Sequence, residues 1–250
     1  MVDLDLVPRT GTGTGTLVVS EIFGPTIQGE GPATGQWCLF VRLGGCNLHC
    51  SWCDTPYTWD WTGRNGVRYT PDSLVRMAPD AVYHRLRELA GTVPRMVVVS
   101  GGEPMLQAGA LVPLLTRLHA DGTRIHIETN GTVVPPRTFP YDLIDHYSVS
   151  LKLPSSGNVG DRTLDDRAIL WYRSTGRAIW KFVATSPADL DAIQAVADRY
   201  TLDPIWVMPE GTDRATILKG MEQLVQPVID RGWNLTTRLH VLLWGNERER

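Results

Sequence analysis

The sequence predicts an α/β fold in which a parallel sheet forms an open, partial (β/α)6 barrel. Short runs rich in β-branched and aromatic residues alternate with longer stretches whose apolar residues recur every three or four positions, which is typical of βα units. The chain of 250 residues contains six expected strands, two fewer than a complete eight-unit barrel has. The expected strands are residues 36–43, 95–100, 123–129, 146–150, 178–184 and 204–208.

Five helices are expected between and after these strands, because their apolar residues follow helical periodicity. In the second helix, Val112, Leu115 and Leu118 would form the buried stripe. Residues 1–16, which end in the run GTGTGT, are expected to be a flexible leader, and residues 17–250 a single domain. The expected helices are residues 71–91, 105–121, 160–175, 187–199 and 213–231.

Composition narrows the class of protein. The chain is 42% hydrophobic and 20% charged, and no apolar run is long enough to cross a bilayer. Its formal charge of -3 gives no global basic field of the kind that drives nucleic-acid binding. The N-terminus lacks the basic and apolar regions of a secretory signal. We therefore expect a cytoplasmic protein that binds neither membranes nor nucleic acid.

Three cysteines, Cys46, Cys50 and Cys53, form a CxxxCxxC motif after the first long strand. In a reducing compartment such a group indicates metal or redox chemistry. A zinc site would need a fourth ligand, for which His49 and Cys38 are the nearest candidates, and a two-thiol redox motif would leave Cys46 unused. Three thiolates on a [4Fe-4S] cluster leave one iron open, so we favour that reading and expect Cys38 to be a buried strand residue.

Polar and glycine residues end several of the expected strands. Because the carboxyl ends of parallel strands meet at one face of the sheet, these segments should line one site. The segments are Ser100–Glu103, Glu128–Gly131, Ser148–Lys152 and Met208–Gly211.

Together, the cysteine motif and Gly101-Gly102-Glu103-Pro104 after the second strand resemble the radical S-adenosylmethionine (SAM) superfamily, in which the open iron binds SAM and cleaves it to a 5′-deoxyadenosyl radical. EIFGPTIQGEG at residues 21–31, CDTPY at 53–57 and ETNG at 128–131 narrow the resemblance to the 7-carboxy-7-deazaguanine synthase family. This resemblance implies a TIM-like partial barrel of the radical SAM type.

For function, the resemblance implies conversion of 6-carboxy-5,6,7,8-tetrahydropterin to 7-carboxy-7-deazaguanine with loss of ammonia, on the route to queuosine and other 7-deazapurines. It implies a [4Fe-4S] cluster, SAM and Mg²⁺ as cofactors, an electron donor such as flavodoxin or ferredoxin, and a homodimer. Whether the product serves tRNA, DNA or a secondary metabolite is left open.

Site residues follow from the resemblance at matching positions. The cluster ligands would be Cys46, Cys50 and Cys53, and Thr55 would contact Mg²⁺, although Asp54 and Thr55 are also typical of a turn cap. The substrate residues would be Ile27, Gln28, Gly29, Glu30, Arg42, Ser100 and His240. The SAM residues would be Trp52, Cys53, Asp54, Gly102, Glu128, Ser150, Leu151, Lys152, Met208, Pro209, Glu210 and Gly211.

Some of these positions have a second possible role. Arg42 would hold the substrate carboxylate with its planar fork, or else pair with a surface carboxylate. His240 fits a substrate contact and a structural histidine equally well. Leu151 stands where the family has proline, which leaves the contacts of Ser150 and Lys152 less defined.

Two other functions compete with this prediction. A glycyl-radical activating enzyme is also a short chain with CxxxCxxC, but it would need a protein-docking surface and has no use for QGEG and Arg42. A non-catalytic iron–sulfur or zinc-binding module would leave the GGEP and ETNG segments without a purpose.

Overall fold

The computed structural model describes residues 15–64, 66–158 and 163–250. Within these ranges the strands form a single sheet in the order β3-β1-β2-β4-β5-β6-β7-β8-β9. The strands are β1 (Leu17–Ile27), β2 (Trp37–Leu43), β3 (Val75–Met77), β4 (Met96–Gly101), β5 (Arg124–Thr129), β6 (His146–Val149), β7 (Ala178–Ala184), β8 (Ile205–Pro209) and β9 (Asn234–Leu235). The α-helices are α1 (Pro79–Ala90), α2 (Ala108–Ala120), α3 (Asp166–Ser174), α4 (Asp189–Tyr200), α5 (Arg214–Asp230) and α6 (Leu239–Trp244).

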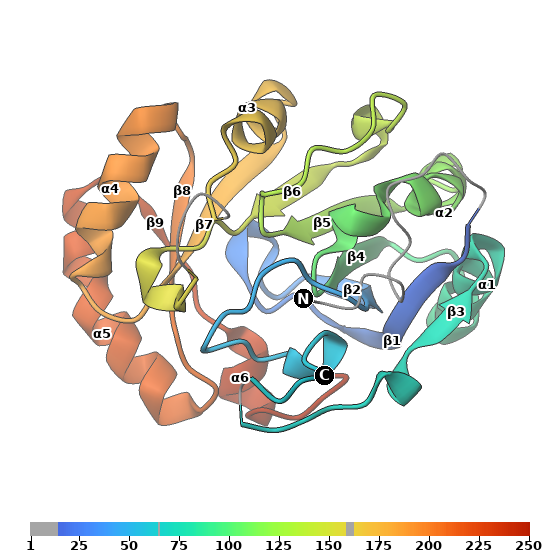
Figure 1. The fold of residues 1–250 in the computed structure, drawn as a ribbon, viewed down its shortest axis with the longest axis horizontal. Helices are drawn as coiled ribbons and strands as arrows, with labels where there is room; N and C mark the ends of the chain where they lie inside the picture. Colours follow the sequence, from blue (N-terminus) through green and yellow to red (C-terminus); the bar gives the residue numbers. More distant parts are fainter. Residues whose placement is uncertain (1–14, 65, 159–162) are drawn as a thin grey trace.

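The predicted parallel barrel is confirmed. All six expected strands are present as β2, β4, β5, β6, β7 and β8, each pairs in parallel with the next, and β9 adds a short parallel strand. Figure 1 shows the sheet as an open arc with α1 to α5 around its outer side. The carboxyl ends of the strands therefore point to one face, as the polar segments predicted.

The N-terminal edge of the sheet was not predicted. β1 runs antiparallel to β2, and β3 adds to the far side of β1, with Leu17 opposite Met77. The expected helix over 71–91 is wrong in its first part, because residues 75–77 pair with β1 and the helix begins only at Pro79. Pairing between segments so far apart in sequence overrides the local helical pattern.

Helix α3 also begins later than the expected 160–175. Asp165 caps it by accepting a hydrogen bond from the Ala168 amide at 2.8 Å, and the helix starts at Asp166. Residues 160–162, like residues 1–14 of the expected leader, lie outside the described residues.

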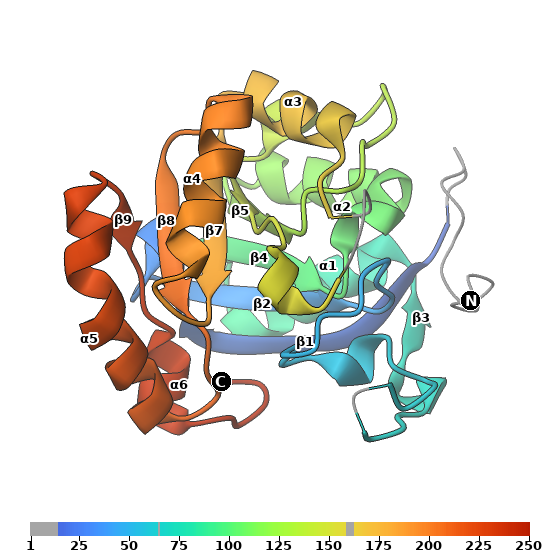
Figure 2. The same ribbon diagram turned by 60° about the vertical axis from the view of Figure 1, so that its left-hand side comes forward.

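The last strands approach the first through loops rather than through sheet pairing. The Gly31 amide donates to Thr236 Oγ1 at 2.8 Å, and the Leu239 amide donates to the Gly29 carbonyl at 2.9 Å. Helix α6, which was not predicted from the sequence, follows this contact and packs beside the N-terminal part of α5 (Figure 2). The gap of the partial barrel is thus spanned by residues 29–31 and 236–239.

Apolar residues alternate between the two faces of the sheet. Leu39 and Val41 of β2 pack under the helices in the main core, whereas Cys38 and Phe40 lie on the inner face in a smaller apolar cluster. Cys38 is fully buried, and burial raises the pKa of its thiol to about 12. The prediction that Cys38 is a buried strand residue is confirmed.

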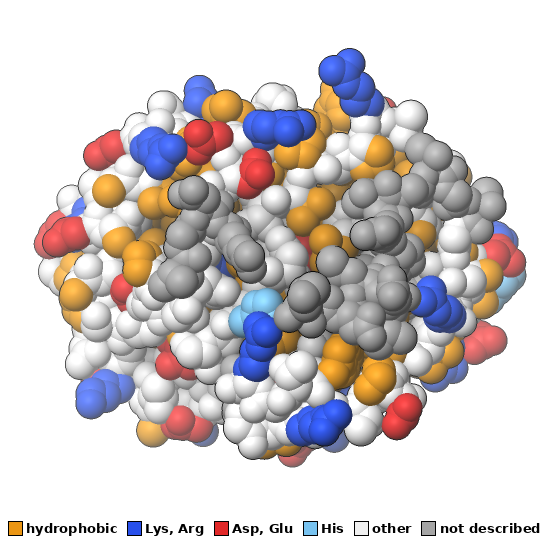
Figure 3. All heavy atoms as spheres, viewed as in Figure 1, with side chains coloured by type: hydrophobic (Ala, Val, Ile, Leu, Met, Phe, Trp, Pro, Cys, Tyr) orange, Lys and Arg blue, Asp and Glu red, His pale blue; other side chains and the backbone are white. Residues whose placement is uncertain are grey.

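No helix in residues 15–64, 66–158 and 163–250 is both long and apolar enough to cross a membrane. On the face drawn in Figure 3, basic and acidic side chains of the described part of the chain are interspersed around the edge.

Two histidines face each other on neighbouring strands. His126 of β5 lies opposite His146 of β6, and their ring centroids are 5.0 Å apart. Burial lowers the pKa of each imidazole to about 4. Both rings are therefore neutral in the folded protein at neutral pH.

This pair should make the protein lose stability as the pH falls from about 6.5 to about 4. In that interval histidines of the unfolded chain, with a pKa near 6.5, bind protons that the folded pair excludes. In His126→Gln about one proton fewer should be taken up on unfolding in this pH interval. The slope of the free energy of unfolding against pH, measured by urea titrations at several pH values, should therefore be smaller. His119→Gln, on the exposed side of α2, is the control, and equal slopes for His126→Gln and wild type would contradict the prediction.

Candidate active site

One cavity collects the carboxyl ends of the parallel strands. It is lined from β2 by Arg42, from β4 by Ser100, from β5 by Glu128 and from β7 by Lys181. The residues predicted for the site that line it are Ile27, Gln28, Gly29, Glu30, Arg42, Cys46, Cys50, Trp52, Cys53, Asp54, Thr55, Ser100, Gly102, Glu128, Ser150, Lys152, Met208, Glu210, Gly211 and His240.

Leu151 and Pro209 were also predicted for the SAM site, but their side chains do not line the cavity. Leu151 is buried in the main core, and Pro209 packs against Gly220 of α5. Alternation along an extended segment explains both positions, since the neighbours Ser150, Lys152, Met208 and Glu210 do line the cavity.

The loop that carries the cysteines, residues 44–59, is called the cluster loop below. Each cysteine sulfur accepts a hydrogen bond from a different group. Cys46 accepts from the Leu48 amide at 3.4 Å, Cys50 from Asn158 Nδ2 at 3.3 Å and Cys53 from Trp59 Nε1 at 3.3 Å. Donors around ligating sulfurs tune the reduction potential of a cluster, so Trp59 and Asn158 belong to the site.

Burial raises the pKa of the Cys46 and Cys53 thiols, so that metal binding would have to supply the charge that stabilises the thiolates. Within the described ranges, no three His, Cys, Asp or Glu side chains converge as ligands of a single ion. Three sulfurs around one cavity, each with its own donor, fit a multi-iron cluster.

The two glycines of the GGEP segment are required by the backbone at the end of β2 and at the start of the cluster loop. A Cβ on Gly101 would lie 2.2 Å from the Leu43 carbonyl oxygen, and a Cβ on Gly102 would lie 2.1 Å from the Gly45 carbonyl oxygen. The Glu103 amide donates to that Gly45 oxygen at 2.8 Å. Only glycine permits this approach, which sets the GGEP backbone directly against the cluster loop.

Glu103 connects the GGEP and ETNG segments. Its fully buried carboxylate accepts from the Met105 amide at 2.9 Å, from Thr129 Oγ1 at 2.8 Å and from the Asn130 amide at 2.6 Å. Through these contacts the Glu103 carboxylate holds the GGEP segment at the end of β4 against the ETNG segment at the end of β5.

Residues 28–36, called the substrate loop below, fold back toward the cavity through Gln28. The Gln28 Oε1 atom accepts from the Gly29 amide at 2.7 Å, and its Nε2 donates to Glu128 Oε1 at 2.9 Å. A Cβ on Gly29 would lie 2.0 Å from His240 Nδ1, so glycine is needed there to admit the histidine ring. Glu128 therefore lies beside the substrate loop.

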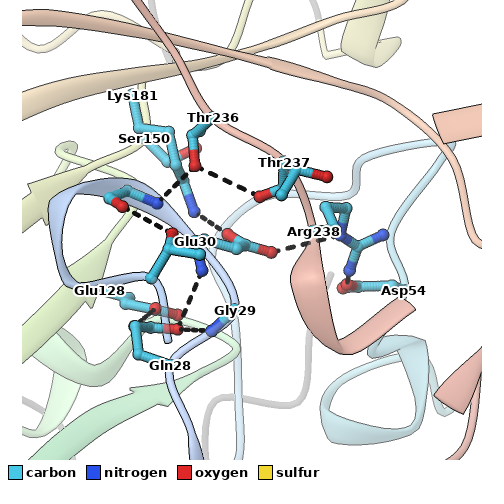
Figure 4. A network of polar contacts seen from close by, with 12 residues as sticks. Gln28, Gly29, Glu30, Asp54, Glu128, Ser150, Lys181, Thr236, Thr237 and Arg238 are labelled. Carbon is cyan, nitrogen blue, oxygen red and sulfur yellow. Dashed lines mark hydrogen bonds and ion pairs between the residues drawn. The ribbon is translucent and has the colours of Figure 1, made fainter. Parts of the chain in front are cut away.

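Glu30 is held by two cations (Figure 4). Lys181 pairs with its Oε2, and Arg238 Nε donates to its Oε1 at 3.2 Å. Burial opposes ionisation of Glu30, but the charges of Lys181 and Arg238 outweigh it and hold the pKa of the carboxyl well below its usual range. Arg238 also donates to the Gly211 carbonyl at 2.6 Å and pairs with Asp54.

Arg42 is held by a buried carboxylate. Its Nε donates to Glu21 Oε2 at 2.8 Å, and the Glu21 side chain is 2% exposed. Tyr57 Oη donates to the same oxygen at 3.2 Å, and Arg248 pairs with the other. Arg42, which lines the cavity, thus has a carboxylate partner, but a buried one rather than one on the surface.

Two buried polar atoms at the cavity have no hydrogen-bond partner in the described residues, namely Ser100 Oγ and Trp52 Nε1. Buried polar groups are normally paired, so both atoms indicate places for ligand atoms. Nearby, Lys152 Nζ donates to the Ser150 Oγ at 2.8 Å and lies 5.7 Å from the Trp52 ring centroid.

Three cavity residues with clear structural roles were not predicted from the sequence. Lys181 and Arg238 hold Glu30, and Trp59 donates to the Cys53 sulfur. Asn130, in the predicted segment Glu128–Gly131, donates to Asn47 Oδ1 at 2.9 Å. A lone lysine in the apolar run AIWKFVA was a signal for Lys181.

Comparison with known proteins agrees with this geometry. The Radical SAM superfamily matches residues 40–155, and relatives of 30–34% identity, described in the next paragraph, align over nearly the whole chain. Together these matches show that the chain is a radical SAM enzyme. The solved structure of SuiB from Streptococcus suis bound to S-adenosylmethionine shares the fold, with a TM-score of 0.53 at 15% identity over 79% of this chain and 49% of that one.

More specific relatives are 7-carboxy-7-deazaguanine synthases. That of Bacillus subtilis is 34% identical over 92% of this chain and 97% of its own, and that of Hyperthermus butylicus is 30% identical over 94% and 96%. The crystal structure of QueE from Escherichia coli aligns with a TM-score of 0.68 at 26% identity, covering 90% of this chain and 95% of that one. The chain belongs to the 7-carboxy-7-deazaguanine synthase family.

Membership of the radical SAM superfamily brings a [4Fe-4S] cluster and SAM as cofactors. The cavity fits both, because three sulfurs share its wall and the unpaired Trp52 Nε1 and Ser100 Oγ atoms lie on the same surface. The Cys38 candidate for a fourth protein ligand is packed with Phe23 and Phe40.

Cys50→Ala should abolish the visible absorbance of the iron–sulfur cluster and all SAM cleavage, because two thiolates cannot hold a cluster that needs three. Cys38→Ala is the matched control, since its sulfur lies in the inner apolar cluster, and it should keep its iron content. The measurement is absorbance and iron analysis after anaerobic reconstitution. A Cys50→Ala protein with full cluster content would contradict the ligand assignment.

Proposed function

We propose that this chain converts 6-carboxy-5,6,7,8-tetrahydropterin to 7-carboxy-7-deazaguanine with loss of ammonia, in 7-deazapurine and queuosine biosynthesis. The observation that carries the proposal is that the cluster cysteines, an ionised Glu30 and Arg42 line the same cavity. The name 7-carboxy-7-deazaguanine synthase, shared by relatives that align over nearly the whole chain, supports it.

The polar groups of the substrate have complementary partners. The pyrimidine edge of a pterin presents N–H donors, which an ionised Glu30 accepts well because Lys181 and Arg238 keep it deprotonated. The substrate carboxylate needs a planar cation, and the ion pair of Arg42 with Glu21 uses only Nε. The unpaired Ser100 hydroxyl offers a further contact.

When bound, the cluster and SAM supply one-electron hydrogen-abstraction chemistry. The chain itself binds and orients the pterin through Glu30 and Arg42. In this proposal the buried Trp59, which donates to the Cys53 sulfur, helps to keep water from the cluster. In this proposal Glu128 and Gln28, joined at 2.9 Å, close the side of the cavity behind the substrate loop.

Mg²⁺ is part of the proposal, with Thr55 as its protein contact. The Thr55 hydroxyl lines the cavity 3.8 Å from the Cys53 sulfur, while the neighbouring Asp54 is engaged with Arg238. Because Mg²⁺ retains several waters and readily takes substrate oxygens, one hydroxyl at the cavity suffices as the protein part of such a site.

We further propose a cytoplasmic homodimer that receives electrons from a flavodoxin or ferredoxin. Support for self-association comes from α5, where Leu218, Val225 and Ile229 are exposed at helical spacing, and from exposed Leu243 on the adjacent α6. Size measurement of the purified holoenzyme by light scattering tests the dimer.

The decisive experiment is anaerobic reconstitution followed by incubation with SAM, a reductant, Mg²⁺ and the carboxypterin. Mass spectrometry should detect 7-carboxy-7-deazaguanine and ammonia release. Cleavage of SAM to 5′-deoxyadenosine without a deazaguanine product would favour another radical substrate, including the glycyl residue of a partner protein. Absence of SAM cleavage would contradict the enzymatic function itself.

Arg42→Lys should raise the KM for the carboxypterin at least tenfold and change the Kd for SAM less than twofold. A lysine ammonium cannot pair with Glu21 and also present a planar fork to the substrate carboxylate. Steady-state kinetics and SAM binding measure the two effects, with Arg124→Lys on the exposed start of β5 as the control. Equal losses for substrate and SAM would contradict the role of Arg42.

A further inference from the structure

The Arg238 guanidinium connects three segments that are far apart in sequence. Its Nε donates to Glu30 of the substrate loop at 3.2 Å, its Nη1 to the Gly211 carbonyl after β8 at 2.6 Å, and its Nη2 pairs with Asp54 of the cluster loop. Arg238 is 7% exposed, so its guanidinium depends on these three partners more than on water. Each nitrogen thus has its own partner, and Figure 4 shows the contacts with Glu30 and Asp54.

The planarity of the guanidinium makes the three contacts interdependent. A rigid fork cannot rotate toward one acceptor without moving away from the others. Asp54 follows the cluster ligand Cys53 directly, and Gly211 lies in the turn predicted to contact SAM. A shift of either segment therefore changes the position of the Nε donor that faces Glu30.

Glu30 has little freedom to move independently of Arg238. Its other carboxylate oxygen is held by Lys181 of β7, whose side chain is 7% exposed. The opposite charges keep Lys181 protonated and Glu30 ionised, since burial disfavours the Lys181 cation but Glu30 and Glu128 outweigh it. This stable ion pair suits the positioning of Glu30 rather than proton transfer by it.

From this geometry we propose that Arg238 is a positioning residue that couples SAM binding at the cluster loop to carboxypterin binding at the substrate loop. SAM contacts that hold Asp54 and the Gly211 turn in place also hold the Arg238 guanidinium in place. The guanidinium in turn positions the Glu30 carboxylate that receives the pterin. By linkage, each ligand then strengthens the binding of the other by the same factor.

The coupling is measured by equilibrium titration of SAM into the reconstituted enzyme with its cluster oxidised, so that no SAM is cleaved. Titrations are run with and without saturating carboxypterin. In wild type the pterin should lower the Kd for SAM at least fivefold, within the usual range of coupling between sites. The coupling ratio is the Kd for SAM without the pterin divided by the Kd for SAM with it. In Arg238→Met this ratio should lie within a factor of two of unity.

Arg231→Met is the matched control. Arg231 also pairs with a carboxylate, Asp191, at 2.9 Å and donates to a backbone carbonyl, that of Pro227, at 3.1 Å, but it lies outside the cavity. It should keep the wild-type ratio. Should Arg238→Met fail to fold or load its cluster, Arg238→Lys takes its place, because one ammonium keeps the charge but cannot replace the three-way fork.

A wild-type ratio in the Arg238 variant, or no effect of the pterin on SAM binding in wild type, would overturn the proposal. Because the proposal rests on the proposed function, product formation by wild type is assayed in parallel. Absence of deazaguanine product from wild type would count against the function, whereas normal product with an unchanged ratio in the variant would count only against the coupling.

Discussion

Compensation of buried charge is the constraint on which the cavity depends. Glu30, Lys181 and Arg238 all lie at its wall with little exposure, and each would be costly alone in a medium that solvates ions poorly. Removing one partner from such a group typically costs about 3–5 kcal/mol, because it leaves an uncompensated charge. The substrate loop, β7 and the segment before α6 are therefore held in one arrangement by electrostatics.

A second buried acid, Glu21, is compensated in the same way beside the cavity residue Arg42. Glu21 of β1 accepts from Arg42 of β2, Tyr57 of the cluster loop and Arg248 of the C-terminal segment. In both networks a residue proposed to face the substrate is tied to the loop that carries the cysteines. The substrate pocket and the cluster site are thus built from shared parts, with Glu103 and the GGEP glycines fixing the backbone between them.

Much of the fold and many of the cavity residues could be predicted because their signals are local. The strands β2 and β4 to β8 are apolar runs, and the polar segments after them meet because parallel strands end on one face. The helix expected over residues 71–91 is wrong at residues 75–77 for a non-local reason, because these residues pair with β1. The side chains of Leu151 and Pro209 do not line the cavity, because alternation along each segment places those of their neighbours there.

The sequence by itself determined the chemistry that spacing can encode: three cysteines for a cluster, two glycines where backbones touch, and an alternation of strands and helices that builds the barrel. Only the tertiary structure decided which charges meet. Lys181 lies 151 residues from Glu30, and Arg238 lies 184 residues from Asp54. No local pattern specifies such pairs, because their contact depends on how far the sheet curves and on how residues 29–31 and 236–239 span its gap.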